Sequence, residues 1–383
     1  MKAVVNYYCS RKGKVYCTML DASKAFDGVK YCKLFDILLQ RGLPAPILRL
    51  LLNQYSRQLV RTFWKVETSH VFQTVNGVRQ GGVLSPVLFT LYIDTLLHRL
   101  EDSGFGCTVG QEYFGVLCYA DDITLLSPTL CGLQNMLAIC EQFGNEYNIN
   151  YNPKKTQCLC FSGKQLPQDT DCATLYGKPI PWSSSAKHLG NVVSADLSDT
   201  ADIQRKKCDF IGRVNSLVSN FKSVPRSVCS HVFNSQCCHF YGTEVWNLQN
   251  STVKSFHVAW RKAIRKMWYL PNTARSAILP HLVKSETIEL QLAKRFMSLY
   301  KMVYRSNNDR LKNLLQISLH ALPNGLVASN MAYTHTQTMD NAEYYRDRAN
   351  VIRDITQVIE GHLQIDNFDI YELKDIMYYA AVF

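Results

Sequence analysis

The sequence predicts an α+β fold in which an antiparallel sheet with packed helices fills the first half of the chain and helices dominate the second half. Two apolar runs, 114–118 and 123–126, flank the tetrapeptide Tyr119-Ala120-Asp121-Asp122. A polar break between two short runs of this kind is typical of a tight β-hairpin. A third apolar run, 15–20, ends in Asp21 and gives way to helical spacing, which predicts a strand in the same sheet.

The other elements follow from apolar periodicity and from the positions of glycine, proline and capping residues. In the first half we expect helices over 31–40 and 46–55, a hairpin from 58–66 and 70–75, a helix that Ser85 caps and Pro86 begins, an amphipathic helix over 130–147, and a strand over 156–161. Further along we expect a polar connection over 162–185 with a small hairpin near 173–176, a helix capped by Ser285, and a loop at 323–325 before two weak final helices.

Charge is distributed unevenly along the 383 residues, whose number suffices for two or three domains. The net charge is +11, and the segment from Thr200 to Arg275 carries twelve Lys or Arg and three Asp or Glu, a balance of +9. Trp246, Trp260 and Trp268 are interleaved with these cations. Such a segment favours binding to a nucleic-acid backbone, and the alternative is a solvated helix face.

The fourteen cysteines show no pair of Cys-x-x-Cys motifs at zinc-finger spacing. We therefore interpret them as reduced thiols of an intracellular protein. The first residues lack the continuous apolar core of a signal peptide, and no run of about 18 apolar residues indicates a membrane span.

Two clusters of carboxylates lie one hundred residues apart, at Asp21 and at Asp121-Asp122. Carboxylates held together at the rim of a core repel one another unless a cation lies between them. A lone Asp-Asp pair is more often a solvated turn, and a lone Asp after a strand is often a helix N-cap. The two clusters together instead predict a site for Mg²⁺, which prefers hard oxygen ligands.

Five motifs in order carry a family resemblance. Five segments resemble reverse-transcriptase motifs A to E. In chain order they are Asp21-x-x-x-Ala25-Phe26-Asp27, Arg79-Gln80-Gly81-Gly82 with Leu84-Ser85-Pro86, Tyr119-Ala120-Asp121-Asp122, Asn152-Pro153-Lys154-Lys155-Thr156 and Lys187-His188-Leu189-Gly190. Their wording is most similar to LINE-type (non-LTR) retrotransposon reverse transcriptases. The resemblance covers residues 15–193 strongly, and the remainder only in general character.

The resemblance implies a polymerase palm with partial fingers, then a mostly helical thumb and a C-terminal extension. We expect the palm, with residual fingers and motifs A to E, over residues 1–195. The basic helical region over 196–275 would act as the thumb, and residues 276–383 would form a helical extension of unknown role.

The resemblance also implies an RNA-directed DNA polymerase, a nucleotidyltransferase that extends a primer 3′-hydroxyl with dNTPs by two-metal phosphoryl transfer. Asp21, Asp121 and Asp122 would be the catalytic residues and the ligands of two Mg²⁺ ions, with Mn²⁺ as a substitute. Asp122 is expected to lie closer to the primer end.

Four residues are expected to contact the incoming nucleotide. Phe26 resembles the steric gate under the sugar, which disfavours a ribose 2′-hydroxyl; the alternative is a core aromatic. Gln80 and Gly81 resemble the motif B pair that meets nucleotide and template, since glycine lets a ligand approach the backbone closely. Lys155 resembles the motif D lysine near the phosphates, although the adjacent Lys154 could take that role, and the alternative is a surface charge pair.

The expected partners are an RNA template, a DNA primer and dNTPs. Tyr119 and Ala120 would lie beside the primer terminus. His188, Leu189 and Gly190 would form the primer grip of motif E. The family resemblance implies a nuclear location.

The family also has a fingers region upstream of motif A, and LINE elements carry an endonuclease, whereas about twenty residues precede Asp21 here. We therefore expect a part of a longer polyprotein or a truncated copy. The alternatives are a catalytically inactive nucleic-acid-binding remnant, an RNA-dependent RNA polymerase and an intron-encoded maturase. Phe26 and Tyr119-Ala120 argue against the RNA polymerase, and the absence of a metal-binding tail argues against the maturase.

Overall fold

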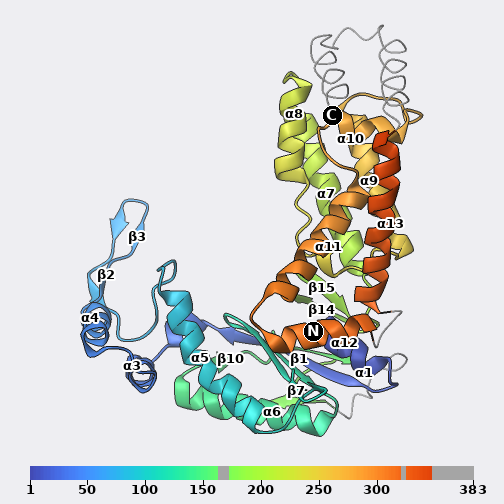
Figure 1. The fold of residues 1–383 in the computed structure, drawn as a ribbon. Coiled ribbons are helices and arrows are strands. Elements are labelled where there is room, and N and C mark those ends of the chain that lie inside the picture. Colours follow the sequence, from blue (N-terminus) through green and yellow to red (C-terminus); the bar gives the residue numbers. More distant parts are fainter. Residues whose placement is uncertain (163–171, 321–324, 347–383) are drawn as a thin grey trace. The chain divides into compact units, whose positions relative to one another are not determined.

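The computed structural model describes residues 1–162, 172–320 and 325–346, and it divides into two compact units (Figure 1). The first comprises residues 1–189 with 194–197, and the second comprises 190–193 with the residues from 198 onward. The expected loop at 323–325 lies mostly outside the described residues, and the last expected helix lies wholly outside them. Among the described residues, no helix has both the length and the apolar character that crossing a bilayer requires.

The first unit is built on a five-stranded antiparallel sheet with β1 (Val15–Ser23) at its centre. One side of β1 pairs with β9 (Asp122–Ser127), which pairs in turn with β8 (Val116–Tyr119). The other side pairs with β10 (Asn150–Tyr151) near the end of β1 and with β11 (Gln157–Phe161) near its start. Both edges of β1 are therefore paired, and the predicted antiparallel sheet is confirmed.

Helices α5 (Ser85–Asp102) and α6 (Leu130–Tyr147) pack with this sheet in one apolar core. Leu20, Ile123 and Leu125 of the strands meet Phe89 of α5 and Phe143 of α6, and all five side chains are buried. Burying side chains of this size contributes about 1.5–3 kcal/mol each. The same core takes in buried residues of α3 (Tyr31–Gln40) and α4 (Ala45–Ser56).

Short elements complete the first unit. They are α1 (Lys2–Cys9), α2 (Ala25–Gly28), β2 (Leu59–Val60), β3 (Phe63–Trp64), β4 (Glu67–Thr68), β5 (Phe72–Gln73), β6 (Thr108–Val109), β7 (Glu112–Tyr113), β12 (Thr174–Leu175), β13 (Lys178–Pro179) and β14 (Ser185–His188). The predicted hairpins near 58–75 and 173–176 are confirmed as β2–β5 with β3–β4 and as β12–β13.

Three local predictions are wrong in detail. Ser85 is the first helical residue of α5 and makes no capping bond, because α5 begins after Leu84. Thr287, not Ser285, caps the later helix by accepting a hydrogen bond from the Leu290 N–H. The strand expected over 114–118 begins only at Val116, because the Phe114 N–H bonds to the Cys107 carbonyl at 2.8 Å instead.

The described part of the second unit is almost entirely helical. It comprises β15 (Asn191–Ser194), α7 (Thr200–Asn220), α8 (Arg226–Val232), the π-helix η1 (Phe233–Cys237), the 3₁₀ turns η2 (Thr243–Val245) and η3 (Ser276–Ile278), α9 (Ser251–Met267), α10 (Leu279–Leu282), α11 (Ile288–Arg305), α12 (Asp309–His320) and α13 (Leu326–Arg346). Its core gathers around Phe233, Phe256 and Trp260, which are fully buried.

The three tryptophans that the sequence interleaves with basic residues belong to this core. Trp246, Trp260 and Trp268 are each no more than 2% exposed, so they are packing residues and not surface platforms for bases. Several cations of the same segment also have internal partners. Arg261 is paired with Glu289, and the Arg265 guanidinium donates to the Ala274 carbonyl at 2.7 Å.

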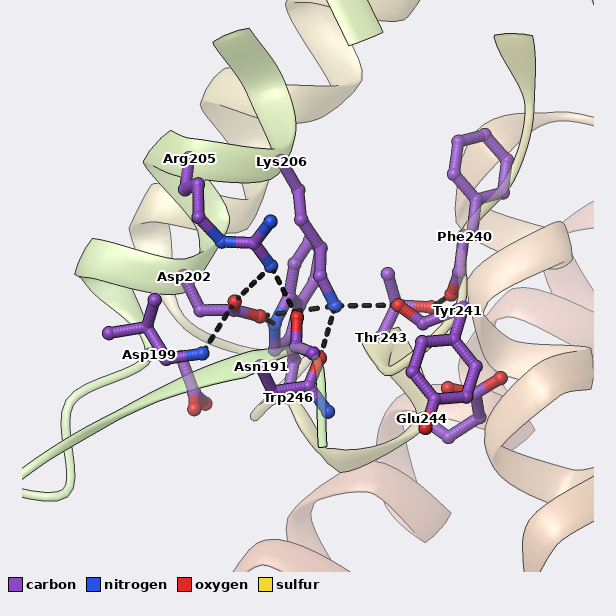
Figure 2. Close-up of polar contacts among 12 residues, drawn as sticks. Asn191, Asp199, Asp202, Arg205, Lys206, Phe240, Tyr241, Thr243, Glu244 and Trp246 are labelled. Carbon is purple, nitrogen blue, oxygen red and sulfur yellow. Dashed lines mark hydrogen bonds and ion pairs between the residues drawn. The ribbon is translucent and has the colours of Figure 1, made fainter. Parts of the chain in front are cut away.

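A buried carboxylate, Asp202 of α7, organises the start of the second unit (Figure 2). It accepts hydrogen bonds from the Val192 N–H at 2.9 Å, from Trp246 Nε1 at 2.8 Å and from Arg205 Nη2 at 2.9 Å. Lys206 Nζ lies 3.2 Å from the same carboxylate and donates to Asn191 Oδ1 and to the Tyr241 carbonyl. Asp202 thus ties β15, α7 and the η2 turn together.

The partners of Asp202 decide its protonation. Burial acts to raise the pKa of Asp202, but the hydrogen bonds from Val192, Trp246 and Arg205, with the attraction of Lys206, outweigh it and hold the pKa below its ordinary value. Burial lowers the pKa of Lys206 in spite of its attraction to Asp202. Asp202 is therefore charged at neutral pH.

We predict that Asp202→Asn lowers the free energy of unfolding of the second unit by about 3 kcal/mol at pH 7, because the substitution removes the carboxylate that pairs with the mostly buried Lys206 and one of the two carboxylates that pair with Arg205. Since the folded pKa of Asp202 lies below the unfolded value of 3.8, its contribution is present above that value and is lost as the pH falls through the folded pKa. Urea unfolding from pH 7 to pH 3 should show the difference narrowing in acid. Asp309→Asn, at a side chain 83% exposed, is the control, and an equal loss there would contradict the prediction.

Candidate active site

The tip of the β8–β9 hairpin carries two of the predicted carboxylates. Tyr119 pairs with Asp122, so Ala120 and Asp121 form a two-residue turn. Ala120 has φ +53°, in the left-handed region that residues other than glycine rarely adopt. Tyr119 is 69% exposed, and Asp121 and Asp122 are also exposed. The hairpin therefore presents its acidic tip to solvent.

The third carboxylate lies directly across the sheet. Asp21 is the Cα partner of Asp122 in the β1–β9 ladder. Burial raises the pKa of Asp122, the charges of Asp121 and Asp21 raise it further, and His188 opposes them. This pattern requires the three carboxylates to be close enough to repel.

Hard oxygen donors crowded in this way match the chemistry of a divalent cation. Within residues 1–162, 172–320 and 325–346, however, no three His, Cys, Asp or Glu side chains are already arranged to hold a metal ion. The fold thus brings the three carboxylates together in register, and their role as metal ligands stays a prediction. Asp21 does not cap a helix, because α2 begins only after Lys24.

The 152–156 turn docks on the backbone of Asp21. The Asn152 N–H donates to the Asp21 carbonyl at 2.9 Å, and the Asp21 N–H donates to Thr156 Oγ1 at 3.3 Å. Thr156 is 1% exposed. This turn lies between β10, which pairs with residues 22–23 of β1, and β11, which pairs with residues 15–19. It therefore supplies hydrogen-bond partners at Asp21, where neither strand pairs. The exposed Lys154 and Lys155 belong to the same turn.

Phe26 lies just beyond the end of β1 on the short helix α2. Its ring stacks on the buried Phe89 of α5, with centroids 4.5 Å apart and planes 18° apart. Its carbonyl accepts a hydrogen bond from the Val78 N–H at 2.9 Å. Phe26 is only partly buried, so one part of the ring packs on the core and another part stays accessible.

The segment that follows Val78 brings motif B beside motif A. Gln80 Nε2 donates to Asp27 Oδ1 at 3.3 Å. Gly81 has φ +78° and open space where a Cβ would lie, whereas a Cβ on Gly82 would come within 2.8 Å of Ser85 Oγ. Gly81 thus combines a backbone conformation suited to glycine with an open approach.

The predicted primer-grip residues divide between the two units. In the first unit, His188 Nδ1 lies 3.4 Å from Thr124 Oγ1 of β9. Burial lowers the pKa of His188, the N-terminal amino group lowers it further, and Asp122 opposes them. Leu189 has φ +45°. Gly190 belongs to the second unit, where its carbonyl accepts a hydrogen bond from Arg205 Nη2 at 2.8 Å.

The first unit therefore brings most of the predicted site together. The three aspartates, Tyr119 and Ala120 lie on the central sheet or in its β8–β9 turn, and His188 of β14 contacts Thr124 of β9. Phe26 and Gln80 adjoin the end of β1, and the turn of Lys155 docks on Asp21. Sequence reasoning missed Thr156 as a partner of Asp21. Its position as the last residue of motif D, directly before a strand, was the available signal.

The chain is similar to reverse transcriptases and to proteins of retrotransposons. The family model "Reverse transcriptase (RNA-dependent DNA polymerase)" matches residues 1–213, more than half of the chain. The Retrovirus-related Pol polyprotein from type-1 retrotransposable element R2 of Nasonia vitripennis is 34% identical over 154 residues, which cover 39% of this chain and 15% of that protein. The probable RNA-directed DNA polymerase from transposon X-element of Drosophila melanogaster is 25% identical over 280 residues, 68% of this chain and 30% of that protein.

Among solved structures, apo telomerase from Candida tropicalis aligns with 98% of this chain and 55% of that chain, at 11% identity and a TM-score of 0.37. The chain spans less than a third of the length of either retrotransposon protein named above.

We predict that Thr156→Val lowers the free energy of unfolding by about 1–3 kcal/mol, because it removes the hydroxyl that accepts from the Asp21 N–H and leaves that donor unpaired. Thr156→Ser, which keeps the hydroxyl, should cost less. Urea unfolding of the three proteins tests this. Equal stability of the valine variant and the wild type would show that the bond to Asp21 contributes nothing.

Proposed function

We infer the function from the family: this chain belongs to the reverse transcriptase (RNA-dependent DNA polymerase) family and is of the non-LTR retrotransposon type. We propose that it extends a primer 3′-hydroxyl with dNTPs on an RNA template. The observation that carries this proposal is the register that sets Asp21 opposite Asp122, beside Asp121 at the hairpin tip.

Membership in this family implies dependence on a divalent metal ion. We propose that Asp21, Asp121 and Asp122 hold two such ions, Mg²⁺ or Mn²⁺. When bound, the cations would supply positive charge to the attacking and leaving oxygens of the phosphoryl transfer. The mutual repulsion of the three carboxylates supports this role, because a cation relieves it.

In the proposed reaction the primer 3′-hydroxyl loses its proton, its oxygen bonds to the α-phosphorus of the nucleotide, and the bond to pyrophosphate breaks. The protein mainly positions these groups and offsets their charge. Tyr119 and Ala120 would support the primer terminus from the hairpin, and the exposed Lys155 would lie near the departing phosphates. His188 to Gly190 would grip the primer strand.

On the nucleotide side, Phe26 would pack under the sugar. Its stacking on the buried Phe89 limits the movement of the ring, so a 2′-hydroxyl would meet a fixed surface. Gly81, open on the side where a Cβ would lie, would let the nucleotide or the template base approach the backbone. The bond from Gln80 to Asp27 supports this arrangement by joining motifs A and B.

We propose that the basic region over 196–275 acts as the thumb and follows the backbone of the copied duplex. The residues suited to this role are exposed cations for which the described part of the chain shows no ion pair or hydrogen bond; they are Arg213, Lys222, Lys254 and Lys262. Arg205, Lys206, Arg261 and Arg265 are engaged within the unit and are not expected to contact nucleic acid first.

We predict that Asp121→Asn lowers the rate of primer extension on RNA with dNTPs and Mg²⁺ by about 10³-fold, because several kcal/mol of electrostatic stabilisation depend on the carboxylate. Asp102→Asn, at an exposed aspartate that ends α5, is the control and should keep the wild-type rate. Wild-type protein that binds an RNA–DNA hybrid in a salt-sensitive way but never extends it would instead indicate an inactive nucleic-acid-binding relative.

We predict that Phe26→Val lowers the preference for dNTPs over rNTPs by about tenfold or more, because the shorter side chain leaves room for a 2′-hydroxyl. Phe26→Tyr keeps the aromatic bulk and should keep the preference. Single-nucleotide extension with each nucleotide type measures kcat/KM for both. An unchanged ratio in the valine variant would assign Phe26 to the core alone.

A further inference from the structure

A long hairpin between α4 and motif B has no role in the proposed reaction. It consists of the pair β2–β5, continued outward by the pair β3–β4, and we call residues 57–75 the arm. In Figure 1 the arm projects beyond the end of α4. Every residue from Arg61 to Gln73 is exposed, so the arm buries almost nothing of its own surface.

The arm exposes large aromatic side chains. Phe63 is 71% exposed and Trp64 is 74% exposed, on the two residues of β3. The other four tryptophans are buried or half-buried, so Trp64 alone of the five has an exposed ring. Exposed aromatic rings contribute little to the stability of an isolated hairpin, because they stay in contact with water. Exposed apolar patches of this kind mark interaction sites.

Cations alternate with these rings along the arm. Arg57, Arg61 and Lys65 are exposed, against one carboxylate, Glu67. Within the described residues none of the three cations has an ion pair or a side-chain hydrogen bond. Aromatic faces beside free cations match the chemistry of a single-stranded nucleic acid, whose bases stack while its phosphates are neutralised. A duplex hides its base faces and offers only the phosphates.

We propose that the arm is a binding site for single-stranded nucleic acid, in which bases stack on Phe63 on one face of the hairpin and on Trp64 on the other while Arg57, Arg61 and Lys65 contact phosphates. The arm joins the segment of Gln80 and Gly81 through Asn76, which bridges to Lys30 of the first unit. A nucleic-acid strand bound to the arm would therefore be bound by residues that directly precede motif B in the sequence. The proposal goes beyond the polymerase activity and is tested without primer, dNTPs or catalysis.

The test uses the full chain and labelled 12-nucleotide single-stranded RNA, single-stranded DNA and a blunt duplex of the same length, with binding followed by fluorescence anisotropy. The double variant Phe63→Ala with Trp64→Ala should weaken single-strand binding by roughly tenfold or more, with little effect on the duplex. Trp64→Phe keeps a stacking surface and should stay near the wild type. Val66→Ala, at an apolar side chain 94% exposed on the same turn, is the matched control.

A second readout isolates Trp64. Its fluorescence should be quenched by unlabelled oligonucleotide and shielded from acrylamide, and both effects should be absent in Trp64→Phe. The comparison of RNA with DNA identifies which strand the arm prefers. Arg61→Gln with Lys65→Gln should reduce the salt dependence of binding.

Three outcomes would overturn the proposal. One is single-strand binding within twofold of the wild type after loss of both aromatics, and another is an equal loss in Val66→Ala. The third is sedimentation of the wild type as a dimer that Phe63→Ala with Trp64→Ala converts to a monomer, without any effect on oligonucleotide binding. That result would assign the arm to a second copy of the chain. Failure of primer extension would leave all of these readings unchanged.

Discussion

The pairing of β1 with β9 is the constraint on which the rest of the candidate site depends. Leu20 and Ile123 face each other across this ladder and are both buried. Because successive side chains of a strand point to opposite faces, that buried pair requires the next pair, Asp21 and Asp122, to face away from it. A slip of one residue would place the carboxylates in the core. The apolar core therefore fixes the position of the acidic site, and no further residues are needed to align the carboxylates.

The carboxylates of Asp202 and Asp122 have different surroundings, which indicate a structural role for the first and a chemical role for the second. Asp202 is buried but accepts three hydrogen bonds and lies beside Lys206, and its pKa is lowered. Asp122 is near two other carboxylates, and burial and these charges raise its pKa against the opposing effect of His188. A satisfied carboxylate stabilises the fold, whereas a crowded one with few partners is typical of a site that binds a cation or substrate.

The sequence predicted those features that depend on local pattern. The hairpin at Asp121 and Asp122, the helices over 31–40 and 130–147 and the central strand all follow from periodicity and turn residues within short windows. It could not predict features that depend on distant partners. The interleaving of tryptophans with cations suggested a nucleic-acid surface, but Trp246 and Trp260 are buried and Arg261 and Arg265 are paired internally. The contact of Thr156 with Asp21 spans 135 residues of sequence.

That contact also links two parts of the proposed chemistry. Asn152 and Thr156 hold both backbone groups of Asp21, and the residues between them include Lys154 and Lys155. The turn is short, with its own bonds from Lys155 and Thr156 back to Asn152. A movement of Asp21 along the strand would therefore carry the two lysines with it. If Asp21 holds a metal ion and Lys155 lies near the departing phosphates, as proposed, two hydrogen bonds to Asp21 set the spacing of these groups. A substitution in the turn would then affect both groups at once.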